Sequence, residues 1–438
     1  MSARRLAYDI LKKASIGSTY SNIALDNAIK RNELTDADRG LITAIVMGVT
    51  ERRLTLDCII DALAAKPDKV DADTRVLLRM GIFQLLFLDR IPEYAAVNET
   101  VSLAPRRSVG FVNAILRSLL RKKKSGELEA LFPVEDEDRI GYLSVKYSFP
   151  EAICQRFADI YGYERAKSVL EFFNRTPRLT LRINPLKISR EGYLELLVER
   201  GIVAEISQDV ENAVILDDAA FSSLPGFDEG YFFVQDLASQ LCVEAVGARP
   251  GELVIDTCSC PGSKSFGMAI GMQNEGRICS FDLHKSKLSL IESGAVRLGI
   301  DIIETDVRDG RVPDEELLEK ADRVLCDVPC SGLGVIAKKP EIRYKDLDEA
   351  ARLPEIQYAI LESSSRYVKV GGVLAYSTCT VLPEENADNV ARFLSEHGEF
   401  EPCDFKVGKW ESQRGMLSLS PDLDKTDGFF IAKMKRVK

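Results

Sequence analysis

Two cysteines each follow an apolar run at a point where the run ends. Cys330 lies in the stretch LCDVPCSGLG, and Cys379 comes directly after VLAYST. Ligands of open α/β sheets bind outside the carboxyl ends of the strands, so both thiols face one pocket if the two strands are neighbours. Cysteine is also a common small core residue, which describes Cys326 inside the first run. The placement of Cys330 and Cys379 beyond the runs favours a chemical role.

A thiolate offers a way to make an unreactive pyrimidine carbon nucleophilic. Addition of the thiolate to carbon-6 of a cytosine turns carbon-5 into an enamine-like nucleophile that attacks an activated methyl group. Asp327, three residues before Cys330, is placed to support the pyrimidine edge, and Lys264 is a candidate cation for lowering the thiol pKa. These residues alone leave open whether Cys330 or Cys379 attacks.

The stretch VIDTCSCPGSKSFG predicts a cofactor loop between a strand and a helix. The strand ends at Asp256, and Gly262 permits close approach of the backbone to a ligand at the helix N-terminus. Twenty residues after Gly262, Asp282 closes the next strand, where an acid accepts hydrogen bonds from ribose hydroxyls. The loop lacks the three glycines of GxGxxG, which favours S-adenosylmethionine over a dinucleotide. Asp309 is a third acid at a possible strand end.

Alternating strands and helices must position these residues. From Gly251 onward, the apolar runs ELVID, GRICSFD, DRVLCD and VLAYST are separated by helical patterns. Continuous apolar strands between helices are typical of an open, doubly wound parallel sheet. We therefore expect an α/β Rossmann-like domain.

The preceding residues predict two other kinds of structure. Residues 1 to about 125 carry apolar stripes at helical spacing, such as the stripe in TDADRGLITAIVMGV after a plausible N-cap at Thr35. A charged junction follows near residues 124–139, and residues 140–240 mix strands such as RLTLRIN with helices. We expect an all-α bundle and then a small α+β module.

Composition narrows the function classes. A net charge of -10 argues against a chain-wide polyanion binder, but residues 105–124 and 175–190 are basic and free of carboxylates. These two segments favour a nucleic-acid surface over a merely solvated helix face. The ten dispersed cysteines and two isolated histidines predict reduced thiols and no metal site. No apolar run reaches about 18 residues, so we expect a cytoplasmic protein without membrane association.

The motifs DVPCSG, YSTCTVLPEEN and DTCSCPGSKS together resemble the RNA cytosine carbon-5 methyltransferases related to the Nop2/Sun proteins. The helical N-terminus is similar to the antitermination factor NusB, and the combination resembles bacterial enzymes that modify small-subunit ribosomal RNA. The resemblance covers nearly the whole chain. It implies a NusB-like bundle at residues 1–135, a small α+β, RRM-like module at 140–235, and a Rossmann-like methyltransferase domain at 236–438.

The resemblance also implies roles for individual residues. The family's TC cysteine is the nucleophile and its PC cysteine assists product release, which assigns attack to Cys379 and release to Cys330, with Asp327 and Lys264 beside them. The expected partner is 16S ribosomal RNA, bound by a monomer. The residues expected to bind S-adenosylmethionine are Cys258, Ser259, Cys260, Pro261, Gly262, Ser263, Lys264, Asp282, Asp309 and Asp327. Those expected to contact RNA are Arg182, Asn184, Arg106, Arg107, Lys122 and Lys123.

One departure from the family pattern concerns the cofactor loop. The family loop reads CAAPGGKT, whereas Ser259, Cys260 and Ser263 stand here in place of two alanines and a glycine. Added side chains there would either crowd the methionine part of the cofactor or shift the loop.

Two other function classes remain open from the residues. A non-catalytic RNA-binding factor is disfavoured because both loop cysteines and Asp327 are present. Methylation of an amino group is disfavoured because such enzymes carry an NPPY-like motif where DVPC stands here.

Overall fold

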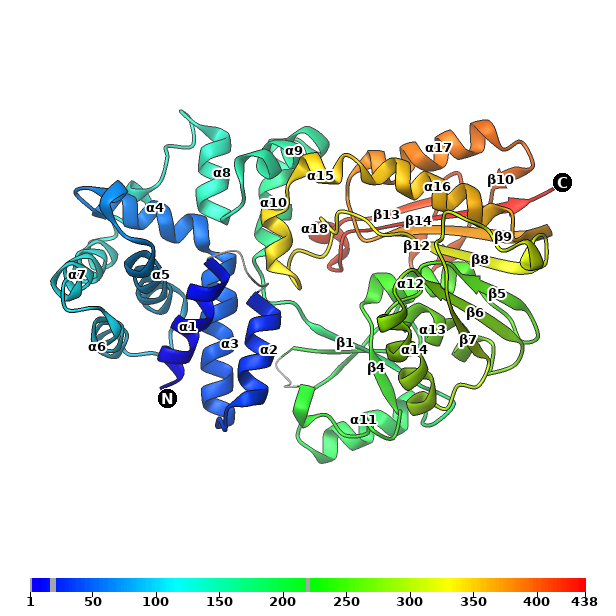
Figure 1. Ribbon diagram of the computed structural model, residues 1–438, viewed down its shortest axis with the longest axis horizontal. Helices are drawn as coiled ribbons and strands as arrows, with labels where there is room; N and C mark the ends of the chain where they lie inside the picture. The colour runs from blue at the N-terminus through cyan, green and yellow to red at the C-terminus, as the bar shows by residue number, and fades with distance from the viewer. Residues whose placement is uncertain (1, 16–20, 218–220) are drawn as a thin grey trace. The chain divides into compact units, whose positions relative to one another are not determined.

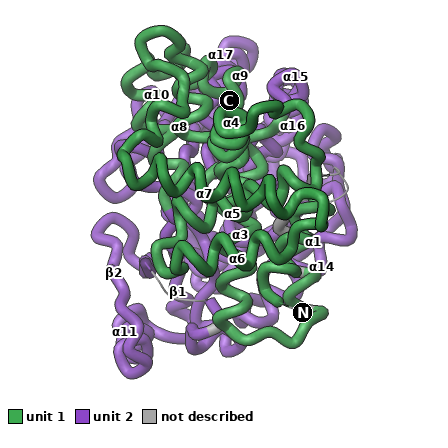
Figure 2. Tube along the Cα trace, turned by 90° about the vertical axis from the view of Figure 1, so that its left-hand side faces the viewer, with its two compact units in different colours: residues 1–175, 336–345 green, residues 176–335, 346–438 purple. Residues whose placement is uncertain are grey.

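The computed structural model describes residues 2–15, 21–217 and 221–438. The chain divides into two compact units, drawn in different colours in Figure 2. The helical unit comprises Met1–Arg175 and Ile336–Lys345, and the sheet unit comprises Thr176–Val335 and Asp346–Lys438. A short segment from the second half of the chain therefore belongs to the helical unit.

The helical unit confirms the predicted all-α N-terminus. Thr35 caps α3, because its hydroxyl accepts a hydrogen bond from the amide of Asp38 at 3.2 Å. Ile42, Ile45 and Val46 of the predicted stripe are completely buried. The helices are α1 (Ala3–Ser15), α2 (Ser21–Arg31), α3 (Asp36–Glu51), α4 (Arg53–Leu63), α5 (Ala72–Phe87), α6 (Glu93–Leu103), α7 (Val109–Ser125), α8 (Arg139–Tyr147), α9 (Glu151–Tyr161) and α10 (Tyr163–Phe173).

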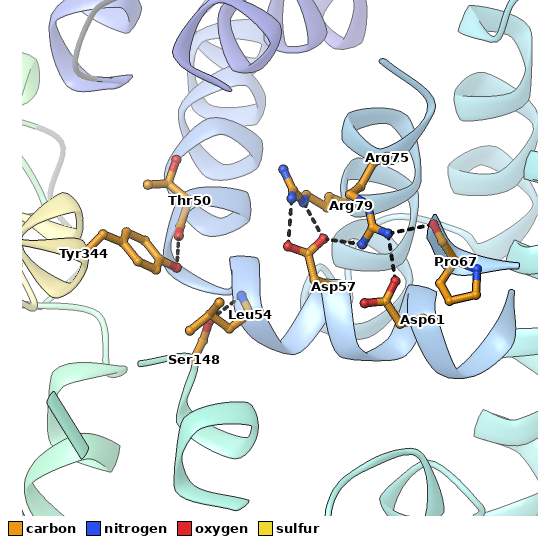
Figure 3. A network of polar contacts seen from close by, with 9 residues as sticks. All are labelled: Thr50, Leu54, Asp57, Asp61, Pro67, Arg75, Arg79, Ser148 and Tyr344. Carbon is orange, nitrogen blue, oxygen red and sulfur yellow. Dashed lines mark hydrogen bonds and ion pairs between the residues drawn. The ribbon is translucent and has the colours of Figure 1, made fainter. Parts of the chain in front are cut away.

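Helices α8 to α10 extend the helical unit beyond the predicted bundle. The Thr55 hydroxyl of α4 donates to the Val145 carbonyl of α8 at 2.5 Å. Figure 3 shows a second contact, in which the Ser148 hydroxyl accepts from the Leu54 amide at 3.0 Å. The compact unit therefore ends at Arg175, whereas the sequence places a domain boundary near residues 135–140. The boundaries at 1–135, 140–235 and 236–438 remain predictions about folding domains.

The segment Ile336–Lys345 is held in the helical unit by two side chains that the sequence did not single out. Arg343 is completely buried and donates from Nη1 to the Glu51 carbonyl at 2.7 Å and to Asn174 Oδ1 at 3.1 Å. Its guanidinium also lies 4.4 Å from the Phe149 ring centroid. The Tyr344 hydroxyl donates to the Thr50 carbonyl at 2.9 Å (Figure 3). Burial lowers the pKa of Arg343 to about 10.

Replacing this arginine tests how much the segment depends on it. We expect Arg343→Met to cost about 3 kcal/mol of local stability, because the buried Glu51 and Asn174 oxygens lose their donor. Hydrogen–deuterium exchange of the full chain should then accelerate around residues 50–54 and 340–345. Arg117→Met on exposed α7 is the matched control and should stay within about 0.5 kcal/mol of the parent. Equal exchange in both variants would contradict a structural role for Arg343.

The sheet unit begins with a small antiparallel sheet and a helix, as predicted. Its strand order is β2-β3-β1-β4, and α11 (Arg190–Glu199) connects β1 to β2. The predicted strand RLTLRIN contains β1 (Leu179–Ile183), which pairs with both neighbours. The other strands are β2 (Glu205–Ile206), β3 (Ala213–Leu216) and β4 (Phe232–Val234).

The larger sheet has the order β10-β14-β9-β8-β5-β6-β7, with β13 paired to β14. Strands β5 to β9 are parallel, which confirms the predicted core of the domain. The antiparallel strands β10, β13 and β14 make the sheet mixed and were not predicted. The bounds are β5 (Leu253–Asp256), β6 (Arg277–Asp282), β7 (Ile303–Val307), β8 (Ala321–Asp327), β9 (Val368–Thr378), β10 (Phe400–Pro402), β13 (Met416–Leu419) and β14 (Phe429–Arg436).

Helices cover both faces of this sheet (Figure 1). One core contains residues of α12 (Leu237–Val246), α13 (Ser263–Gly271) and α14 (Lys285–Leu298), and the other contains residues of α16 (Leu353–Ser365) and α17 (Ala387–Glu396). Successive strand residues alternate between the two cores, as the two-residue period of a strand requires. Among the described residues, no helix is long and apolar enough to cross a bilayer.

Candidate active site

The parallel pairing of β5, β6, β8 and β9 brings their carboxyl ends to one edge of the sheet. Asp256 of β5 lies opposite Leu325 of β8, and Asp327 of β8 lies opposite Ser377 of β9. The strand order reverses direction between β5 and β8, because β6 and β7 continue on one side and β9 on the other. Such a switch point is where open α/β sheets bind their ligands.

Cys330 and Cys379 lie in the two loops that leave this edge, as expected if β8 and β9 are neighbours. Their sulfur atoms are 3.2 Å apart, and the Gly334 amide donates to the Cys379 carbonyl at 3.0 Å. The contact with the Cys379 thiol, burial and the nearby Glu385 charge together hold the pKa of Cys330 well above its usual value. Two thiols in such contact do not both ionise near neutral pH, so at least one of them keeps its proton.

An ion pair lies beside the thiols. Lys264, in the first turn of α13, places Nζ 2.6 Å from Asp327 Oδ2, and the Ser377 hydroxyl donates to Asp327 Oδ1 at 2.7 Å. Burial lowers the pKa of Lys264, but the charge of Asp327, the nearby Cys242 and Cys379 sulfurs and the hydrogen bond to Asp327 together raise it, so the ammonium stays charged. Lys264 and Asp327, which the sequence analysis singled out separately, thus form an ion pair. The positive charge of Lys264 also acts on Cys379.

The cofactor loop turns sharply before α13. Gly262 has φ +105°, and a Cβ there would lie 2.7 Å from the Phe266 ring, so both conformation and space require glycine. The Ser259 hydroxyl donates to the Phe281 carbonyl at 2.9 Å, and the Cys260 thiol contacts the Lys287 carbonyl at 3.5 Å. The side chains that depart from the family pattern at these two positions are therefore bound to neighbouring backbone.

Acidic side chains follow β6 and β7 at the same edge. Asp282 is mostly buried at the end of β6, and its Oδ1 accepts from the His284 amide at 2.9 Å. Asp309 lies beyond β7 and forms an ion pair with Arg311 at 2.6 Å. That pair lowers the pKa of Asp309, so its carboxylate is ionised at neutral pH.

Asp256 is a buried carboxyl group at the end of β5. Its Oδ2 accepts from the Ser265 hydroxyl at 2.7 Å, while Oδ1 has no hydrogen-bond partner among the described residues. Burial is the main cause that raises its pKa to about 7. The folded protein therefore holds a proton on Asp256 at pH values where the unfolded chain has released it.

The sign of the resulting pH dependence follows from linkage. Because the folded pKa is raised from 3.8 to about 7, the contribution of Asp256 to stability is full below about pH 4 and declines until about pH 7. Asp256→Asn has no such titration. We expect the free energy of unfolding of the variant, relative to the parent, to improve by a few kcal/mol between pH 5 and pH 8, measured by urea denaturation. A pH-independent difference would contradict the raised pKa.

Arg182 and Asn184, two of the residues expected to contact RNA, are buried in the structure. Asn184 is inaccessible and donates to the carbonyls of Gly230 and Leu298 at 3.0 and 2.9 Å. Arg182 donates to Gln235 Oε1 at 3.3 Å, and Gly267 makes room for its guanidinium. The sequence pattern of a basic, alternating strand shows that charged residues are present but not which of them face the core. Here both side chains form hydrogen bonds that hold β1 to its neighbours.

The four basic residues expected on the helical unit differ in their surroundings. Arg106 and Arg107 are exposed, and Arg107 lies 3.9 Å from Asp71. Lys122 pairs with Glu127 at 3.3 Å, and Lys123 donates to the Leu85 carbonyl at 2.6 Å. Arg106, Arg107 and Lys123 are thus exposed, although the Lys123 ammonium is bound to a backbone carbonyl.

Several polar residues at the site were not singled out from the sequence. Glu385 and Gln357 are completely buried beside the cysteine loops, and Ser377 orients Asp327. Glu385 stands in the stretch TCTVLPEEN, six residues after Cys379. This closeness in sequence to a candidate nucleophile was the signal that could have identified Glu385.

Comparison with known families divides the chain into three regions. Residues 243–435 match the family described as 16S rRNA methyltransferase RsmB/F. Residues 1–121 match the NusB family. Residues 149–221 match the ferredoxin-like domain of RsmF/B-like methyltransferases. The predicted NusB-like bundle, small α+β module and Rossmann-like methyltransferase fold are confirmed.

Full-length relatives give the same picture. The chain is 37% identical to the probable ribosomal RNA small subunit methyltransferase B of Bacillus subtilis, with 99% of each chain covered. It is 32% identical to the ribosomal RNA small subunit methyltransferase B of Escherichia coli K12, with 92% of each covered. The crystal structure of PH0851 matches with a TM-score of 0.80 and 27% identity, covering 99% of this chain and 98% of that chain. NSun6 from Pyrococcus horikoshii, solved with SFG, has the same fold over 67% of this chain and 99% of its own, at a TM-score of 0.60 and 21% identity.

Proposed function

The chain belongs to the 16S rRNA methyltransferase family RsmB/F, and we propose that it methylates carbon-5 of a cytosine in small-subunit ribosomal RNA through a covalent cysteine adduct. The observation that carries this proposal is the 3.2 Å contact between the Cys330 and Cys379 sulfur atoms at the carboxyl edge of the sheet. A methyl transfer to an oxygen or amino group needs no thiol at this place, because those atoms are already nucleophilic.

The residues at the edge suit S-adenosylmethionine. Gly262 leads the backbone into α13, and Asp282 and Asp309 lie at and beyond the ends of neighbouring strands, where their carboxylates would accept hydrogen bonds from the ribose hydroxyls and the adenine amino group of the cofactor. The Ser259 and Cys260 side chains are engaged with backbone carbonyls, which is compatible with a cofactor in the loop. The bound cofactor supplies an electrophilic methyl group.

Cys379 is the nucleophile of the proposed reaction. Lys264, whose charge interacts with the Cys379 thiolate, favours ionisation of this thiol. The sulfur forms a bond to carbon-6 of the cytosine, and the electron pair of the 5,6 double bond moves toward carbon-5, which takes the methyl group. A water molecule or neighbouring base takes the carbon-5 proton, the electrons of that C–H bond restore the 5,6 double bond, and the carbon–sulfur bond breaks, so that Cys379 leaves as a thiolate.

Asp327 and Cys330 have supporting roles. Asp327 is oriented by Lys264 and Ser377, and its remaining lone pairs accept a hydrogen bond from the pyrimidine edge. Cys330 assists release of the methylated RNA, as the family resemblance implies, from a position in contact with the attacking sulfur. The target base must leave any stack to reach this edge, which costs a few kcal/mol.

Alanine variants of the two thiols test this division of roles. Incubated with unmethylated 16S RNA and labelled S-adenosylmethionine, Cys379→Ala should form no methylated product, because carbon-6 receives no nucleophile. Cys330→Ala should accumulate a covalent protein–RNA adduct, because release fails after methyl transfer. Mass spectrometry of the protein and denaturing gels of the labelled RNA measure both outcomes.

Other outcomes have definite meanings. An adduct that accumulates in Cys379→Ala instead would reverse the two roles. Full methylation by both variants would disprove the thiol mechanism. Cys403→Ala is a matched control, because this partly exposed cysteine lies outside both loops and its loss should change neither product nor adduct.

The basic segment of the helical unit generates a prediction about RNA affinity. Affinity of the protein for 16S RNA should fall as salt rises, and Arg106→Ala with Arg107→Ala should reduce the slope of log affinity against log salt by about 2, because two phosphate contacts are lost. Filter binding between low and moderate salt measures both slopes. The double variant Lys66→Ala with Lys69→Ala removes two exposed charges elsewhere in the helical unit and is the control. An unchanged slope in the arginine variant would remove this segment from the RNA surface.

A further inference from the structure

Glu385 has a completely buried carboxylate that touches both cysteine loops. Its Oε2 accepts from the Ser331 amide at 2.9 Å, and Ser331 follows Cys330 directly. Its Oε1 accepts from the Thr380 hydroxyl at 3.3 Å, and Thr380 follows Cys379 directly. The Ser331 and Thr380 hydroxyls also contact each other at 2.6 Å. One carboxylate is therefore bound to the residue after each thiol.

Further buried amides complete this cluster. Gln357 of α16 donates from Nε2 to Glu385 Oε2 at 2.7 Å and to the Pro329 carbonyl at 3.0 Å. Asn386 donates from Nδ2 to the Thr380 carbonyl at 3.0 Å. The Asn389 amide in turn donates to Gln357 Oε1 at 3.3 Å. The loop before Cys330 and the loop after Cys379 are thus tied to the same group of side chains.

Neutral groups alone satisfy the charge of Glu385. Within the part of the chain that the structure describes, its carboxylate forms no ion pair with a lysine, arginine or histidine. A buried carboxylate that lacks a cation is costly unless hydrogen bonds compensate, and three donors do so here. An uncharged glutamine would fill the same volume, so packing alone does not explain a carboxylate at this position.

We propose that Glu385 is a positioning residue that holds the two cysteine loops in register and keeps the shared proton of the thiol pair on Cys330, leaving the negative charge on Cys379. This inference rests on the proposed two-thiol reaction. Glu385 acts through Ser331 and Thr380 and does not itself touch the substrate. The PEEN stretch, which contains Glu385, thus makes two chemically identical thiols differ in their ionisation.

Electrostatics supply the direction. The Glu385 charge is among the causes that raise the pKa of Cys330, whereas Lys264 carries a positive charge that interacts with Cys379. Because the Glu385 charge disfavours the Cys330 thiolate and the Lys264 charge favours the Cys379 thiolate, a pair that holds one proton places it on Cys330. The attacking thiol is then ionised before the RNA arrives, and the releasing thiol remains protonated.

Two substitutions separate the effect of the negative charge of Glu385 from the effect of its side-chain length. Glu385→Gln keeps the length of the side chain, and its amide oxygen still accepts from Ser331 and Gln357 while its NH₂ group faces the Thr380 hydroxyl. Glu385→Asp keeps the charge but is one methylene shorter, so it does not reach both loops. Glu362→Gln removes a carboxylate from the exposed face of α16 and serves as the matched control.

The first readout is alkylation without RNA. Full-length protein is treated with iodoacetamide from pH 6 to 9, and the Cys330 and Cys379 peptides are quantified by mass spectrometry. In the parent and in Glu362→Gln, Cys379 should react first. In Glu385→Gln, loss of the negative charge lowers the pKa of Cys330, so the ratio of Cys330 to Cys379 alkylation at neutral pH should rise about tenfold, equivalent to about one pKa unit.

The second readout is single-turnover methylation of 16S RNA. Glu385→Gln should lose about tenfold in rate with its pH profile moved to lower pH, and Glu385→Asp should lose about 10²-fold with an unmoved profile, because the loops separate. An alkylation order in Glu385→Gln identical to the parent would overturn the inference. Failure of the proposed function is distinguishable, because Cys379→Ala would then remain active whatever the alkylation order in Glu385→Gln.

Discussion

The contact between the Cys330 and Cys379 sulfur atoms depends on the parallel pairing of β8 with β9. Parallel strands end at the same edge of a sheet, so loops that are far apart in sequence leave the sheet side by side. The register Asp327↔Ser377 sets the two loops level with each other, and the hydrogen bonds from Gly334 to Cys379 and from Ser331 to Glu385 hold them there. Without that register the chain would carry two unrelated thiols.

Charge at this edge is arranged in a small, poorly solvated volume. Lys264 forms an ion pair with Asp327 and its charge also acts on Cys379, while the Glu385 carboxylate is bound to both cysteine loops and its charge raises the pKa of Cys330. Asp256, one strand away, has its pKa raised to about 7 by burial, so it carries a proton below that pH. In a medium of low dielectric constant each of these charges shifts the pKa of its neighbours, whereas water would screen the interaction. The chemistry of the thiols therefore follows from their neighbours more than from their own identity.

Two buried arginines show a different use of positive charge. Arg343 binds backbone carbonyls within the helical unit, and Arg182 braces the small sheet of the sheet unit. Burial lowers the pKa of each to about 10, yet both remain protonated at neutral pH. Basic residues in a nucleic-acid-modifying chain thus divide into those that meet solvent, such as Arg106, and those that hold loops and strands together.

Sequence by itself determined the local features of this protein. The apolar runs located β5, β6, β8 and β9, helical periodicity located the bundle, and residue types after the strand ends pointed to Asp282, Asp327, Cys330 and Cys379, because each of these signals lies within a few neighbouring residues. Tertiary structure alone decided the burial of Arg182 and Asn184, the antiparallel strands at the C-terminus, and the placement of Glu385 against Ser331 and of Arg343 against Glu51. These partners are 54 and 292 residues apart in sequence. Such contacts depend on how whole elements pack, and no periodicity or motif within a single segment contains that information.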